Sequence, residues 1–197
     1  MANIYKHAKY EDYINSQMRN EGLTEGTKTT WKGARLEDIA VVKKVFPEAK
    51  SALCIGCRHE AEVQDFIDAG FDSKGIDLFT SSALVEKLDM HEMGDHFAPH
   101  QFDVCYMSHS LEHCMNPTKV FQALAKISRM GVSVVLPSTT TPDPHDTCVF
   151  DFMKTEVTDF GQVAQEIAQF TDRKFVIDGY GRRPARGLEI IFSIKWL

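Results

Sequence analysis

Two positions in the chain have the residue types and spacing of a nucleoside-binding site. Gly56 ends the apolar run 51–56, and Asp77 ends the next apolar run, 21 residues after that glycine. A turn glycine lets the backbone approach a ligand closely. An acid about 20 residues beyond the first turn is placed to accept hydrogen bonds from both ribose hydroxyls of an adenosine. By themselves, the two residues are also consistent with ordinary turn chemistry.

A third segment carries more potential chemistry. Residues 102–113, Phe-Asp-Val-Cys-Tyr-Met-Ser-His-Ser-Leu-Glu-His, run from an apolar strand through a turn toward a helix, and place His109 and His113 beside Glu112. Together with Gly56, Asp77 and the mid-loop acid Asp89, this segment resembles the class I S-adenosylmethionine-dependent methyltransferases that carry an FDV…LEH segment after the fourth strand. The resemblance covers residues 51–137 by motif and 138–197 by the order of elements.

The resemblance implies a set of cofactor contacts. The turn after the first strand would run under the methionine part of S-adenosylmethionine, Asp77 would hold the ribose, and the residues after Asp77 and around Asp89 would meet the adenine. Ser108 and His109 would lie near the sulfonium and the incoming substrate. The implied cofactor-binding residues are Ile55, Gly56, Cys57, Arg58, Glu60, Asp77, Leu78, Asp89, Met90 and Ser108.

The turn after the first strand departs from the family pattern. Cys54 stands where the family has an acid, and Arg58 and Glu60 stand where it has further glycines. Glu60 would then accept from the ligand's ammonium, and Arg58 would reach its carboxylate. The same departures favour an alternative, a catalytically inactive module that binds S-adenosylmethionine or S-adenosylhomocysteine, or a regulatory module.

The elements that position these residues follow from hydrophobic periodicity. Strand-length and helical patterns alternate from residue 51, which predicts an α/β fold, a Rossmann-like three-layer sandwich. Its sheet is mostly parallel, with an antiparallel C-terminal strand from a hairpin of strands 175–178 and 188–194. We expect a third strand at 84–90, and a helix that starts after Asn116 and is closed by Gly131. A strand at 132–136, ended by Pro137, should follow.

The chain divides by pattern into two parts. We expect residues 1–50 to form an N-terminal helical cap or lid. The resemblance implies that residues 51–197 form the methyltransferase-like domain, within one globular unit. Acidic residues are concentrated in the middle. Residues 51–138 sum to −6, while the flanking segments cancel. A cofactor with a sulfonium and an ammonium against one carboxylate is cationic, so this segment suits it electrostatically.

Composition excludes several classes of protein. The chain has 197 residues, 22 basic against 28 acidic side chains and 43% hydrophobic residues, which is a globular composition. The acidic balance disfavours nucleic acid and anionic membranes as partners, and the Met-Ser-His-Ser strand end lacks the Asn/Asp-Pro-Pro-aromatic signature of adenine-amino methylases. No apolar run approaches the length of a membrane span, and the first residues lack the basic and apolar pattern of a signal peptide. Five cysteines suggest reduced thiols, so we expect a cytoplasmic protein.

Three metal or redox interpretations compete with these assignments. His109, Glu112 and His113 fit the H-x-x-E-H pattern of inverted zinc peptidases, although His109 would sit in a turn. Cys54 and Cys57 have C-x-x-C spacing, for which buried apolar packing is the plainer explanation. One loop contains four residues that could bind a metal, but their spacing is irregular. They are His91, Glu92, His96 and His100.

Two further segments could select the substrate. The loop 142–148 follows the fifth strand and would overhang the pocket, where His145 could accept a proton. The basic residues Arg182, Arg183 and Arg186 could bind an anionic group or brace the hairpin.

Taken with the resemblance, the sequence predicts a methyltransferase with a small-molecule acceptor. His109, His113 and His145 are the candidate bases where the acceptor is protonated.

Overall fold

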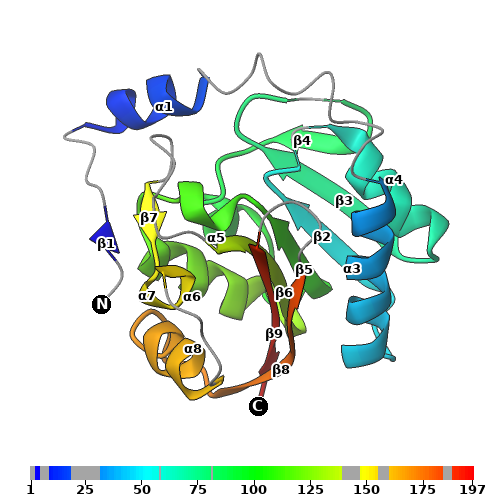
Figure 1. Cartoon of the computed structure of the whole chain (residues 1–197). Helices are drawn as coiled ribbons and strands as arrows, with labels where there is room; N and C mark the ends of the chain where they lie inside the picture. The colour runs from blue at the N-terminus through cyan, green and yellow to red at the C-terminus, as the bar shows by residue number, and fades with distance from the viewer. Residues whose placement is uncertain are drawn as a thin grey trace.

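A mixed β-sheet runs through the centre of the computed structural model (Figure 1). The structure describes residues 3–4, 9–18, 32–57, 59–80, 82–138, 147–154, 160–183 and 188–197. Within these ranges seven strands pair in the order β4-β3-β2-β5-β6-β9-β8. Their bounds are β2 Ser51–Ile55, β3 Asp72–Asp77, β4 Val85–Lys87, β5 Phe102–Ser108, β6 Ser128–Ser138, β8 Phe175–Arg183 and β9 Leu188–Trp196.

The strand directions agree with the predicted fold class. Neighbours from β4 to β6 are parallel, whereas β9 is antiparallel to both β6 and β8. Strand order switches between β2 and β5, because β3 and β4 add on one side of β2 and the later strands on the other. In such a sheet, ligands bind outside the carboxyl ends of the strands at the switch point.

Helices cover both faces of the sheet (Figure 1). The helices α3 Lys32–Val45 and α4 Glu60–Asp68 share one core cluster with Cys54 of β2. The opposite cluster holds Leu53 and Ile55 of β2, because successive strand residues face opposite sides. It includes residues of α5 Met93–His96, α6 Pro117–Ile127, α7 Asp151–Lys154 and α8 Phe160–Ile167. The three-layer sandwich is confirmed.

Smaller elements complete the described chain. The helix α1 Tyr10–Met18 lies outside the sandwich, and the short strands β1 Asn3–Ile4 and β7 Cys148–Val149 pair antiparallel. The turn η2 Leu111–His113 is one 3-10 turn after β5. The helix α3 falls within the predicted N-terminal cap, and it packs directly on the sheet.

The start of α6 is confirmed, but its predicted end at Gly131 is wrong. The Asn116 side chain accepts a hydrogen bond from the Lys119 N–H at 3.0 Å and caps the helix. The helix ends at Ile127, and β6 begins at the next residue. Gly131 lies inside β6, where an added Cβ would be 2.0 Å from the Ile194 carbonyl oxygen. The glycine therefore reflects close packing in the sheet and not a helix stop.

Several strand boundaries also differ from the prediction. The hairpin strands extend beyond 175–178 and 188–194, because β8 runs to Arg183 and β9 to Trp196. The strand β4 is shorter than 84–90, so Asp89 and Met90 lie in the loop after it. The strand β6 does not stop at Pro137, which pairs with Glu189 of β9. The longer pairing brings Glu189 toward the carboxyl end of the parallel strands, which matters for the site below.

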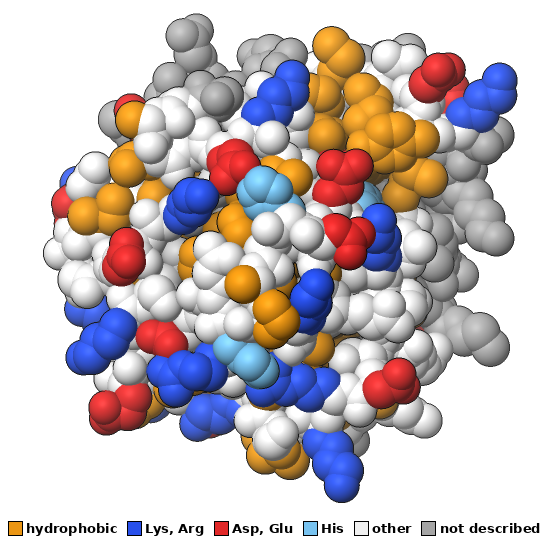
Figure 2. All heavy atoms as spheres, turned by 180° about the vertical axis from the view of Figure 1, so that it is seen from behind, with side chains coloured by type: hydrophobic (Ala, Val, Ile, Leu, Met, Phe, Trp, Pro, Cys, Tyr) orange, Lys and Arg blue, Asp and Glu red, His pale blue; other side chains and the backbone are white. Residues whose placement is uncertain are grey.

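The face shown in Figure 2 has no large area in which charged side chains are all of one sign. Lys and Arg side chains there are interspersed with Asp and Glu side chains, and hydrophobic side chains gather near the upper edge. Among the described residues, no helix has the length and apolarity that a membrane crossing requires.

Candidate functional site

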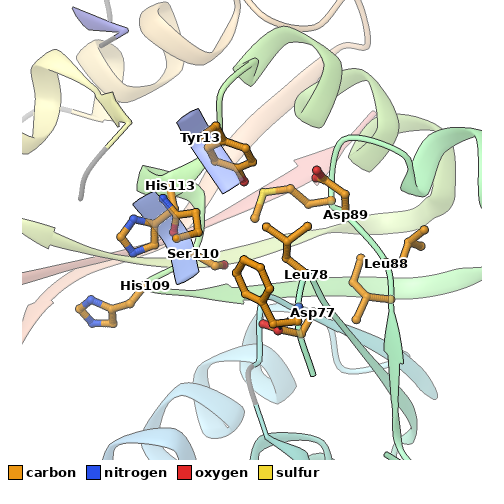
Figure 3. Close-up of a pocket in the computed structure, with 13 residues that line it drawn as sticks. Tyr13, Asp77, Leu78, Leu88, Asp89, His109, Ser110 and His113 are labelled. Carbon is orange, nitrogen blue, oxygen red and sulfur yellow. Dashed lines mark hydrogen bonds between the residues drawn. The ribbon is translucent and has the colours of Figure 1, made fainter. Parts of the chain in front are cut away.

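A pocket opens at the carboxyl ends of β2, β3 and β5, next to the switch in strand order (Figure 3). Its empty volume is about 460 Å³, including space that is open to solvent. The described residues that line it are Tyr13, Gln17, Gly56, Ile76, Asp77, Leu78, Phe79, Leu88, Asp89, Met90, His109, Ser110 and His113.

Gly56 forms a close junction between two strand ends. It has a φ of 71°, and an added Cβ would lie 2.5 Å from the Ser110 Cβ. The Gly56 N–H donates to the Ile76 carbonyl at 2.8 Å, and the Ser110 hydroxyl donates to the Ile55 carbonyl at 2.8 Å. The Ser110 side chain therefore occupies the space that a Cβ on residue 56 would need, so the close packing of the turns after β2 and β5 requires a glycine here.

Asp77 is held rigidly at the end of β3. Its Oδ1 accepts hydrogen bonds from the Phe79 and Thr80 N–H groups, both at 2.9 Å, and the residue is 6% exposed. These bonds fix the carboxylate where the chain turns away from the sheet. Leu78 and Leu88 lie beside it on the same side of the pocket (Figure 3). The acid and the apolar wall are suited to a ribose joined to a planar base.

Asp89 is the centre of a buried hydrogen-bond network. Its Oδ1 accepts from the His91 N–H at 2.8 Å and pairs with His91 Nδ1 at 2.6 Å, while its Oδ2 accepts from the Tyr10 hydroxyl. His91 Nε2 in turn accepts from the backbone N–H groups of Met115 and Asn116, at 3.0 and 3.2 Å. The Asp89 carboxylate is thereby tied to α1, its own loop and the start of α6.

The bonds to Asp89 control its ionisation. Burial acts to raise the pKa of Asp89, but the hydrogen bonds from His91 and Tyr10 outweigh it and hold this pKa below its ordinary value. Conversely, burial and the Asp89 carboxylate raise the pKa of the Tyr10 hydroxyl. Tyr10 therefore stays protonated and donates to an ionised Asp89 at neutral pH.

The helix α1 brings side chains to the pocket that the sequence did not reveal. Tyr13 and Gln17 line the pocket from this helix, and Tyr13 packs edge-on against His91 with ring centroids 5.7 Å apart. Tyr13 is almost fully buried. No chemical motif marks α1 in the sequence, because its contribution depends on where residues 9–18 dock on the fold.

His109 and His113 lie together on the side of the pocket opposite Asp77 (Figure 3). His109 follows β5 directly with a φ of 52°, and its N–H donates to the Val135 carbonyl at 3.0 Å. Its Nε2 is 2.9 Å from Glu189 Oε1 of β9, and its Nδ1 is 3.6 Å from Glu112 Oε1. Glu189, a single acid in an apolar strand, is a site residue that the sequence reasoning missed.

The structure does not bring every predicted residue to the pocket. Ile55 and Cys57 are buried beneath the turn, Glu60 is exposed on α4, and Ser108 is half-buried in β5, so none of these side chains lines it. Arg58 and His145 lie outside the described residues. Arg186 and the side chains of Arg182 and Arg183 lie outside them as well.

The metal and redox interpretations gain no support. His109 and His113 stand at the two ends of a turn, so they do not share a helical face as a zinc peptidase requires. Among the described residues, no group of three or more His, Cys, Asp or Glu side chains is arranged to hold a metal ion. Burial raises the pKa of both Cys54 and Cys57 well above the ordinary value, which disfavours reactive thiolates.

Solved structures share this architecture at low sequence identity. A Burkholderia thailandensis 1,6-didemethyltoxoflavin-N1-methyltransferase, with bound 1,6-didemethyltoxoflavin and S-adenosylhomocysteine, superposes with a TM-score of 0.72 at 13% identity, covering 97% of this chain and 92% of that one. A magnesium protoporphyrin IX methyltransferase from Synechocystis PCC 6803 with bound S-adenosylmethionine gives 0.55 at 10% identity, with coverages of 98% and 88%.

A third similar structure is an S-adenosylmethionine-dependent methyltransferase from Archaeoglobus fulgidus, with a TM-score of 0.57 at 15% identity, covering 95% of this chain and 100% of that one. No curated protein sequence matches the chain. The family model described as "Methyltransferase domain" matches residues 38–136, which contain Gly56, Asp77, Asp89 and His109. The chain therefore belongs to the methyltransferase-domain family, as a class I S-adenosylmethionine-dependent methyltransferase.

Proposed function

We propose that the pocket binds S-adenosylmethionine and transfers its methyl group to a small-molecule acceptor. The observation that carries this proposal is the position of the pocket, at the switch point and between Gly56 on β2 and Asp77 on β3. A side chain at position 56 would strike Ser110, so the junction requires a glycine, and Gly56 itself lines the pocket. A carboxylate fixed opposite this junction suits the ribose hydroxyls.

The cofactor contacts follow the shape of the site. The backbone of Ile55, Gly56 and Cys57 would underlie the methionine part, with Arg58 and Glu60 near its carboxylate and ammonium. Asp77 would accept from the ribose hydroxyls, while Leu78 and Met90 would enclose the adenine. Asp89 Oδ1 already accepts from two groups of His91, so Oδ2, which accepts from Tyr10, is the oxygen left to meet the adenine amino group.

The chain's own residues would act mainly by positioning and by excluding water. When bound, S-adenosylmethionine supplies an electrophilic methyl group that a nucleophile attacks in line. Tyr13 and Gln17 of α1 line the pocket and would help to keep water from a bound ligand. His109 and His113 would serve as proton acceptors at the opposite end from Asp77, and Ser108 would border the same region. His145 keeps its predicted role as a further proton acceptor.

A small acceptor is supported by the lining of the pocket. Tyr13 of α1 and the two histidines all line it, so an acceptor would have to fit beside them. The similar Burkholderia protein is named for N1-methylation of 1,6-didemethyltoxoflavin, and the Synechocystis protein for methylation of magnesium protoporphyrin IX. Five free thiols support a cytoplasmic location, because thiols stay reduced in that compartment.

The alternative is a binding or regulatory module that holds the cofactor without transferring its methyl group. The altered turn favours it, because Cys54 replaces an acid and Glu60 is exposed instead of lining the pocket. The two functions differ in whether S-adenosylhomocysteine accumulates with an acceptor present.

Turnover with a panel of acceptors distinguishes the two. Purified protein is incubated with S-adenosylmethionine and phenols, enols, amines or ring N–H heterocycles, and S-adenosylhomocysteine is measured by mass spectrometry. The proposed enzyme releases it with at least one acceptor class, and the Asp77→Ala variant does not. Binding of S-adenosylhomocysteine without release in any acceptor class supports the regulatory module instead.

A further inference from the structure

One histidine of the pocket lies between two buried carboxylates. His109 Nε2 is 2.9 Å from Glu189 Oε1, and His109 Nδ1 is 3.6 Å from Glu112 Oε1. The side chains of Glu112 and Glu189 are each 2% exposed, whereas that of His109 is 24% exposed. The carboxylates are therefore fixed in the protein interior, and the imidazole between them remains accessible from the pocket.

Three separate elements hold this arrangement. His109 directly follows β5, Glu112 belongs to the turn η2, and Glu189 belongs to β9, 80 residues after His109 in the sequence. The left-handed backbone at His109, with a φ of 52°, is unfavourable for a residue with a side chain. Such conformations persist where the surroundings determine them, and they concentrate at functional sites. Two buried acids beside one imidazole also point to a functional role, because burying a charged group is costly unless it has a specific partner.

The two distances assign different roles to the ring nitrogens. A carboxylate can only accept, so a hydrogen bond between Glu189 and Nε2 requires the proton on Nε2. Nδ1 is then the nitrogen at which His109 gains or loses its second proton. At 3.6 Å, Glu112 is too far from Nδ1 for a good hydrogen bond, but it is close enough to stabilise an imidazolium.

We propose that Glu189 is a positioning residue that fixes the tautomer of His109, and that Glu112 stabilises the imidazolium formed when His109 Nδ1 takes a proton from the methyl acceptor. This inference rests on the proposed function. The acceptor's O–H or N–H bond gives its proton to Nδ1 and its electron pair to the new bond with the methyl carbon. The sulfur–methyl bond breaks, and its electron pair remains on S-adenosylhomocysteine.

This chemistry defines the class of acceptor. The nucleophilic atom must carry a proton that becomes acidic as the methyl group is transferred, as in a phenol, an enol or a ring N–H heterocycle. Thioethers and tertiary amines have no such proton and gain nothing from His109. When thioethers and tertiary amines are added to the acceptor panel, S-adenosylhomocysteine release should therefore be confined to O–H and N–H acceptors, and Glu189→Gln should lower kcat more than it changes KM.

The direct test is the tautomer of His109 in the S-adenosylhomocysteine complex. Protein labelled with ¹⁵N in its histidine rings is examined by long-range ¹H–¹⁵N correlation, and the His109→Asn variant identifies the signal. Wild type should show the proton on Nε2 in the neutral ring. Glu189→Gln keeps the shape but can also donate a hydrogen bond, so it should give a mixture of tautomers. The wild-type spectrum is decisive even if the variant folds poorly.

A second histidine–glutamate pair supplies a matched control. His96 Nε2 lies 2.8 Å from Glu86 Oε1 outside the pocket, so Glu86→Gln should move the His96 signal and leave that of His109 unchanged. A neutral His109 with its proton on Nδ1, or an unmoved signal in a folded Glu189→Gln variant that binds S-adenosylhomocysteine, would overturn the inference alone. Wild-type protein that binds no S-adenosylhomocysteine would overturn the proposed function instead.

Discussion

Replacing Glu62 by Gln should stabilise the protein at neutral and alkaline pH. Glu62 lies in the first turn of α4 and is 8% exposed, and its Oε1 has no hydrogen-bond partner among the described residues. Burial raises its pKa from 4.5 to about 8, against the lowering effect of Arg35 and with the help of Asp38 and Asp65. The folded protein therefore keeps a neutral acid here at pH 7.

The sign of the effect follows from proton linkage. Between pH 4.5 and about 8 the folded state retains the Glu62 proton and the unfolded state has lost it. The stability contributed by this group is therefore complete below pH 4.5 and is lost as the pH rises toward 8. One group changes the free energy of unfolding by about 1.4 kcal/mol per pH unit, so the loss between pH 5 and pH 8 is at most about 4 kcal/mol. A glutamine has no such dependence.

Urea unfolding at pH 5, 6, 7 and 8, followed by circular dichroism, measures this difference. The stability of Glu62→Gln relative to wild type should grow steadily with pH. Glu60→Gln, a change at an exposed position two residues earlier on the same helix, should run parallel to wild type. Parallel curves for Glu62→Gln and wild type over this range would refute the assignment of a buried neutral acid.

Three further outcomes follow from the site and the fold. Gly56→Ala should lose about 1–3 kcal/mol of stability and weaken S-adenosylhomocysteine binding, because of its φ of 71° and the 2.5 Å approach to Ser110. Gly33→Ala, with nothing within 4 Å, is its control in α3, and equal effects of the two on thermal unfolding would contradict the reasoning. Tyr10→Phe should speed dissociation of S-adenosylhomocysteine in stopped-flow measurements by removing the hydroxyl that ties α1 to Asp89. An unchanged rate would show that α1 does not retain the ligand. Asn116→Ala should cost about 1 kcal/mol in urea unfolding, since the side chain caps α6, and a neutral result would count against that cap.

Local patterns were sufficient to predict most of the fold. Asn116 and Pro117 mark the start of α6 correctly, and the hairpin of β8 and β9 follows from two apolar runs around a Gly/Arg/Pro loop. The errors arose where tertiary packing overrides a local signal. Gly131 resembles a helix stop in the sequence, yet it is required because the Ile194 carbonyl and the Phe46 ring occupy the space that a Cβ would need.

The part of the site that depends on local motifs was predictable, and the part that depends on tertiary packing was not. Gly56, Asp77 and Asp89 occupy motif positions, and all three line the pocket. Tyr13 and Glu189 were missed because their contribution depends on the docking of distant elements, a helix near the N-terminus and the last strand. A lone acid within Leu-Glu-Ile-Ile-Phe was the available signal for Glu189, since a buried acid in an apolar strand usually has a specific partner.

Calorimetric titration with S-adenosylmethionine and S-adenosylhomocysteine tests the central claim most directly. Wild type should bind both ligands, and Asp77→Ala should weaken binding about 100-fold, because two hydrogen bonds from the ribose to a charged acceptor are lost. Asp77→Asn keeps an oxygen for the Phe79 and Thr80 N–H groups, and so separates loss of the ligand's acceptor from collapse of the turn. Absence of binding to either ligand at near-millimolar concentration, or equal binding by wild type and Asp77→Ala, would contradict the account.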